Sequence, residues 1–207
     1  MKKFIFYMVL ILLLATVPAA LAAGEYAAYS NAAYGYTVQY PAGWMALSAD
    51  TLGPMIQQFT GENASVFGTD AMDGFESDMS VDAAGIAVFL DVSGNSFSVI
   101  PFAFLTADSM QEAHDALSTE LASAYQQNLD GVTVVDSGSV VAIGSNEFIR
   151  VRLEYAADGQ TMVITSFFNF QNNVMFQLSF TWLTAGESDV QALDQIMETV
   201  VASFNVA

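Results

Sequence analysis

The chain has 207 residues, of which 54% are hydrophobic, 22 are acidic and only four are basic. Lys2 and Lys3 stand at the start, so the rest of the chain carries two basic residues, Arg150 and Arg152, and a net charge of 2 − 22 = −20. This charge repels phosphate backbones and anionic membranes and excludes nucleic acid as a partner. The hydrophobic content excludes a fully disordered acidic chain.

Residues 1–22 are predicted to be a cleavable signal peptide. Lys2 and Lys3 precede the apolar run Phe4–Val17, and the small residues of Ala20-Leu21-Ala22 form the cleavage motif. The run is short for a membrane span of about 20 residues, so a retained anchor is the lesser alternative. The chain has no cysteine for lipidation. We therefore expect a secreted or periplasmic protein with no membrane span after cleavage.

The first elements after the signal are predicted to be a short lead and a hairpin. Residues 23–33 are small and polar and predict a flexible lead, followed by a single domain over residues 34–207. Tyr36–Tyr40 has the β-branched and aromatic residues of a strand, which Pro41 would end. Ala42-Gly43 then predicts a turn into a second strand, Trp44–Leu47.

The middle of the chain alternates helices and strands. Pro54 in the first turn favours a short helix over residues 51–59, and an acidic loop is predicted over residues 61–82. Strands are predicted at Gly85–Val92 and Ser96–Phe104, joined by a turn. A long helix is predicted from Thr106 or Asp108 to about residue 130 from its apolar stripe.

The second half of the chain is predicted to be a β-meander closed by a helix. Its strands are predicted at residues 132–135, 140–143, 147–155, 161–170 and 174–182. In the last strand Val174, Phe176, Leu178, Phe180 and Trp182 alternate with other residues, which indicates one buried face. Phe167 and Phe168 point to opposite faces, so we expect the sheet to be covered on both. An amphipathic helix follows, with its apolar side ending at Phe204.

This order of elements resembles the PsbP-like family of extracytoplasmic domains, which includes the PsbP and DcrB types. The resemblance rests on the segments Gly35–Trp44, Glu147–Tyr155, Phe176–Thr181 and Val201–Phe204, and it covers most of residues 34–206. It implies an α+β fold, with an antiparallel β-sheet flanked by helices in an α/β/α sandwich. It also implies a binding or assembly role with no catalytic residues to transfer and no cofactor.

The acidic loop is a candidate cation site. Asp70, Asp73, Glu76 and Asp78 supply the carboxylate oxygens that Ca²⁺ or Mn²⁺ prefers. Their spacing does not match an EF-hand loop. The alternative is a solvated acidic loop on an acidic protein.

Arg150 and Arg152 lie two residues apart on a predicted strand, so both side chains point to one face. They are candidates for contact with an anion or a partner. The alternative is pairing with Glu147, Glu154 or acids of neighbouring strands.

Catalysis finds little support in the sequence. The single histidine, His114, stands beside Asp115 on a helix, and one histidine is too few for a zinc site. We expect a non-enzymatic binding module whose partner is a protein or small molecule. The alternatives are a Ca²⁺- or Mn²⁺-dependent module and a hydrolase with two carboxylates. The identity of the ligand and the oligomeric state stay open at this point.

Overall fold

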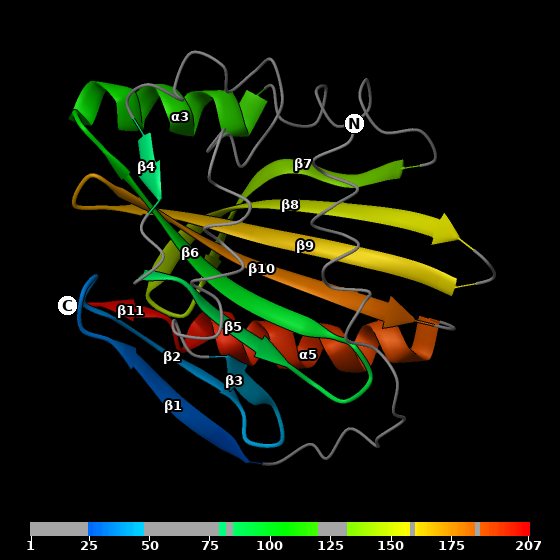
Figure 1. The fold of residues 1–207 in the computed structure, drawn as a ribbon. Coiled ribbons are helices and arrows are strands. Elements are labelled where there is room, and N and C mark those ends of the chain that lie inside the picture. The colour runs from blue at the N-terminus through cyan, green and yellow to red at the C-terminus, as the bar shows by residue number, and fades with distance from the viewer. Residues whose placement is uncertain (1–24, 48–78, 82–84, 120–131, 158–159, 185–186) are drawn as a thin grey trace, which may run out of the picture.

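The computed structural model describes residues 25–47, 79–81, 85–119, 132–157, 160–184 and 187–207. This part of the chain forms two antiparallel sheets and two helices (Figure 1). The predicted signal peptide and the predicted helix of residues 51–59 lie outside the described residues.

The larger sheet has eight strands in the order β3-β5-β6-β10-β9-β8-β7, with β4 paired to β6 beside this path. Every pair of neighbouring strands is antiparallel. The sequence therefore predicted the class of sheet correctly. The strands are β3 (Met45–Leu47), β4 (Met79–Val81), β5 (Ala87–Leu90), β6 (Ser96–Phe104), β7 (Val132–Ile143), β8 (Asn146–Ala157), β9 (Gln160–Gln171) and β10 (Val174–Thr184).

Strand β10 lies near the middle of this sheet and divides the core into two layers. Phe176, Leu178, Phe180 and Trp182 belong to one buried cluster, whereas Met175 belongs to the other. Phe167 and Phe168 on β9 are divided between the clusters in the same way. The predicted alternation and the predicted cover on both faces are therefore confirmed.

The two helices cover opposite faces of the sheet (Figure 1). Helix α5 (Glu187–Ala202) contributes Leu193 and Met197 to the cluster of Phe180, and helix α3 (Ala107–Thr119) contributes Ala113 and Leu117 to the cluster of Phe168. Thr106 caps α3 as predicted, since its Oγ1 accepts the Ser109 N–H at 3.1 Å. The predicted continuation of this helix to residue 130 lies outside the described residues.

The smaller sheet corrects the prediction of a flexible lead. Strand β1 (Tyr26–Asn31) lies within residues 23–33 and pairs along its whole length with β2 (Tyr36–Pro41). The short β11 (Asn205–Val206) pairs with the other edge of β2. Residues 26–31 are ordered because Tyr26 and Tyr29 pack against the cluster that α5 covers.

The predicted hairpin of residues 36–40 and 44–47 is wrong. The two strands form, but β2 joins the smaller sheet and β3 pairs with β5 in the larger one. The turn remains, with the Trp44 N–H donating to the Pro41 carbonyl at 2.9 Å. The Trp44 ring packs edge-on against Trp182 with centroids 5.7 Å apart, which directs the chain from one sheet to the other.

Two further elements differ from their predictions. Residues 79–81, at the end of the predicted loop, form β4 and pair with β6. The two short strands predicted at residues 132–135 and 140–143 are one strand, β7, because the residues between them stay paired with β8. This continuous strand forms one end of the larger sheet and positions the candidate site.

Candidate functional site: the ion-paired edge of the larger sheet

Arg150 and Arg152 point to the α5 side of β8, which confirms that they share a face. Ile149 and Val151 alternate with them and belong to the cluster on the α3 side. Phe148, two residues before Arg150, lies in the cluster on the α5 side. The period of two along a strand therefore places both cations beside α5 and the outer strand β7.

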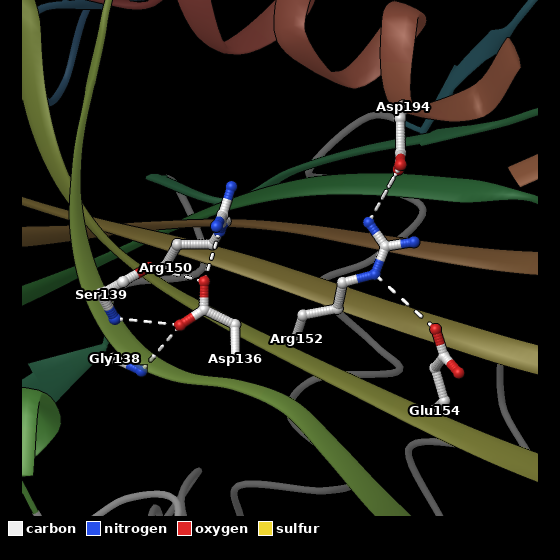
Figure 2. Close-up of polar contacts among 7 residues, drawn as sticks. All are labelled: Asp136, Gly138, Ser139, Arg150, Arg152, Glu154 and Asp194. Atoms are coloured by element: carbon white, nitrogen blue, oxygen red, sulfur yellow. Dashed lines mark hydrogen bonds and ion pairs between the residues drawn. The ribbon is translucent and has the colours of Figure 1, made fainter. Parts of the chain in front are cut away.

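Arg150 pairs with Asp136 on the neighbouring strand β7. Its Nε donates to Asp136 Oδ2 at 2.6 Å, and Asp136 also accepts bonds from the Ser139 hydroxyl at 2.6 Å and the Ser139 N–H at 3.0 Å. The Gly138 N–H donates to Asp136 Oδ1 at 3.3 Å. Figure 2 shows Asp136 between the backbone of β7 and the guanidinium of Arg150. One carboxylate thus holds the irregular middle of β7 against β8.

These contacts decide the charge state of Asp136. Partial burial alone would raise the pKa of its carboxyl, because it disfavours the charged form. The hydrogen bonds from Ser139 and the guanidinium of Arg150 oppose this and hold the pKa below its ordinary value of 3.8. Asp136 is therefore ionised at neutral pH and its charge is compensated locally.

Arg152 connects the sheet to helix α5. Its Nη1 donates to both carboxylate oxygens of Asp194, at 2.9 and 3.1 Å, and its Nε lies 3.9 Å from Glu154 Oε1 (Figure 2). Only 14% of the Arg152 side chain is exposed. The sequence had offered Glu154 and acids of neighbouring strands as partners, and both kinds are present. Asp194 lies 42 residues away on the last helix and had no signal in the sequence.

The outer side of β7 is a free edge in the described part of the chain. The strand has 12 residues, stands last in the order of the larger sheet and pairs with β8 alone among the described strands. The register with β8 shifts between Val134 and Asp136 and again between Ser137 and Ser139, so the strand carries two bulges. Gly138 lies in the second bulge with a φ of 116°, a conformation that glycine adopts without strain.

The free edge carries almost no charge and exposes two valines. Val135, at the first bulge, is 53% exposed, and Val140, two residues after the second bulge, is 54% exposed. Asp136 is the single charged residue of the strand and is paired with Arg150. Natural edge strands are commonly protected from pairing by charges, prolines or bulges. Strand β7 has two bulges but no proline, and its single charge is neutralised by Arg150. The edge therefore remains suited to pairing with another uncharged strand.

The predicted cation ligands Asp70, Asp73, Glu76 and Asp78 lie outside the described residues. Within the described ranges, no three His, Cys, Asp or Glu side chains are grouped to hold a metal ion. His114 is partly exposed; its Nδ1 lies 3.4 Å from Asp115 Oδ1, and its ring packs edge-on against Phe170. This histidine has the surroundings of a residue on the flank of a helix.

No family model matches this chain, and no curated protein matches its sequence. Solved structures do resemble it. The solution structure of cyanobacterial PsbP from Synechocystis has a TM-score of 0.50 and 13% identity, and the match covers 93% of this chain and 98% of that one. The yeast Ran-binding protein Mog1p, from Saccharomyces cerevisiae, has a TM-score of 0.48 and 12% identity over 88% of this chain and 95% of its own.

A Bacteroides thetaiotaomicron structure has a TM-score of 0.45 and 14% identity; the match covers 87% of this chain and 48% of that chain. This chain therefore spans about half the length of that protein. The likeness to cyanobacterial PsbP shows the fold alone: a PsbP-like α+β fold with an antiparallel sheet between helices. Among the described residues, no helix has the length and apolar composition needed to cross a membrane.

Proposed function

We propose that this chain is an exported, non-enzymatic binding or assembly module that holds an extended segment of a protein partner along the outer edge of β7. The observation that carries the proposal is the edge itself, with 12 residues of strand, two half-exposed valines and one compensated charge. A partner strand that pairs there satisfies the outward backbone groups and gains specificity from alternate side chains. Export is proposed from the signal peptide predicted over residues 1–22.

The ion-paired cluster of Asp136, Arg150, Arg152 and Asp194 does not supply the acid of a hydrolase with two carboxylates. A hydrolase with two carboxylates needs one carboxyl group that keeps its proton at the working pH. Asp136 has the opposite property, because Ser139 and Arg150 stabilise its ionised form. Arg152 is likewise engaged with Asp194 and Glu154. The ion pairs of Arg150 with Asp136 and of Arg152 with Asp194 form a clamp that fixes β7 and α5 to β8.

We assign Arg150 and Arg152 a positioning role in this function. Arg150 holds the bulged part of β7, and Arg152 holds helix α5 over the same face. Their direct contact with an anionic group of a partner stays a separate prediction, which replacement of both by glutamine would test. If they only position the strand, the double variant weakens binding of charged and uncharged peptides equally.

The proposal is tested with a fluorescent peptide of alternating threonine and valine, 12 residues long and flanked by serines. Its anisotropy is measured against the purified protein, the variant Val140→Lys and the variant Leu105→Lys. Leu105 is 73% exposed and lies outside β7, so this control matches the added charge. We expect the peptide to bind and Val140→Lys to weaken it about tenfold, since a lysine on an edge opposes strand pairing. No binding, or equal loss in both variants, contradicts the proposal.

A further inference from the structure

We infer that the partner that fits the β7 edge is a second copy of this chain, paired antiparallel along β7. This inference rests on the proposed binding role of that edge and names its occupant. It follows from three properties of the strand: the symmetry of its sequence, its local charge and the position of its bulges.

The sequence of β7 is nearly the same in both directions about its middle. Reading outward from Ser137-Gly138, serine or aspartate comes next on each side and a pair of valines follows: Val134-Val135 on one side and Val140-Val141 on the other. In an antiparallel pair centred on Ser137, Val134 of one copy lies opposite Val140 of the other. Both side chains are on the α3 face, because Val134 pairs with Leu153 and Val140 with Ile149 of the cluster on that face. A two-fold interface requires such self-complementarity, because the same patch is used twice.

The local charge of the strand favours a neutral partner. Beyond residue 22 the chain has two basic and 22 acidic residues, so a basic partner would be attracted to most of its surface. The outer strand differs, because its single acid is paired with Arg150 and its other residues are uncharged. In the antiparallel arrangement centred on Ser137, Asp136 lies opposite Gly138 of the second copy and is offset from the second Asp136. The edge thus presents little charge to a strand of its own kind.

The bulges set the strength of the association. They lie at Val135 and Gly138, on either side of the point about which the two copies pair. Regular strand remains on both flanks, over residues 132–134 and 140–142, and each flank meets the opposite flank of the second copy. Bulges disrupt a ladder of hydrogen bonds locally. Two short regular flanks separated by a bulged centre therefore give a weak and reversible dimer. Val135 and Val140, about half exposed in the single chain, become covered in it.

The test is sedimentation velocity of the purified protein over a concentration series, in low and high NaCl. We expect a monomer–dimer equilibrium that shifts toward dimer in high salt, because salt screens the repulsion between two acidic molecules. Val140→Lys should raise the dissociation constant about tenfold or more, whereas the control Leu105→Lys should leave it unchanged. Circular dichroism and urea unfolding establish that both variants are folded.

A compensating variant tests the antiparallel arrangement itself. Val134→Glu combined with Val140→Lys places each new lysine opposite the glutamate of the second copy. We expect this double variant to recover part of the association that Val140→Lys loses. Recovery supports the arrangement, and a failure to recover overturns it.

The remaining outcomes separate this inference from the function on which it rests. A protein that stays monomeric but binds the threonine-valine peptide keeps the proposed function and overturns the second copy as occupant. A protein that neither dimerises nor binds the peptide contradicts both. A dimer that is insensitive to Val140→Lys uses another surface and also overturns the inference.

Discussion

Strands β10 and β7 belong to the same sheet and have 11 and 12 residues, yet they differ in nearly every physical respect. Strand β10 has neighbours on both sides, and its aromatic residues are fully buried. Strand β7 has a neighbour on one side in the described part of the chain, and its valines alternate between half-buried and exposed positions. Strand β10 therefore stabilises the fold. Strand β7 has outward backbone N–H and C=O groups that no other described strand pairs with.

The largest effect on this comparison should come from Phe180→Ala in β10. Phe180 is fully buried, stacks on Phe97 with centroids 4.6 Å apart and also contacts Trp182. Removing the ring should lower the free energy of unfolding by about 3–5 kcal/mol, through lost burial and the cavity left behind. Val140→Ala, at the exposed edge, should change it by no more than about 0.5 kcal/mol. Urea unfolding of both variants measures the difference, and equal losses would contradict the division between core and edge.

A smaller effect is expected from Asp136→Asn, which weakens the clamp within β7. The variant loses the charge-assisted bonds from Ser139 and Arg150, so the free energy of unfolding should fall by about 1–3 kcal/mol. Val135→Thr, in the same strand but outside the clamp, serves as the control.

The pH dependence of this loss follows from the lowered pKa of Asp136. A carboxyl whose pKa is lowered in the folded state adds stability above its unfolded pKa, and this stability is lost as the pH falls through the folded value. The difference between the wild type and Asp136→Asn should thus be constant above about pH 5 and shrink below about pH 4. Urea unfolding from pH 2 to 7 tests this. A difference that grows on acidification would rule out the clamp.

The contrast between β10 and β7 also explains what the sequence could reveal. The alternation of Phe176, Leu178, Phe180 and Trp182 predicts a buried strand directly, because each face of a buried strand selects its residues. In β7 the same reasoning gave two short strands, since Asp-Ser-Gly-Ser is typical of a turn. The bonds that Asp136 accepts across the bulges keep these residues in the strand, and they depend on Arg150 of the next strand.

The candidate site was predicted only where its geometry is local. The spacing of Arg150 and Arg152 fixes their common face, and this needs no knowledge of the tertiary structure. Asp194 approaches Arg152 through the packing of α5 on the sheet, which no local pattern encodes. The order of Tyr26–Asn31 likewise depends on tyrosines that pack against a distant cluster. The position of β7 at an edge likewise depends on the spatial order of the described strands, which no local sequence pattern encodes.

The smallest expected effect concerns cations and the acidic segment of residues 61–82. We expect CaCl₂, MnCl₂, MgCl₂ and NaCl of matched ionic strength to raise the unfolding midpoint equally, because all screen the repulsion among the carboxylates. A specific site filled to 100 times its dissociation constant would add about 2.7 kcal/mol. A rise with Ca²⁺ or Mn²⁺ alone, abolished by EDTA and by Asp70→Asn with Asp73→Asn, would instead favour the cation-dependent module.

Amide hydrogen exchange shows whether the outer edge of β7 receives a partner strand. Exchange reports the opening and protection of individual backbone amides over minutes to hours. With saturating threonine-valine peptide, we expect slower exchange for the outward amides of residues 132–143 and no change in β10. Unchanged exchange in β7, or protection confined to another surface, would contradict it.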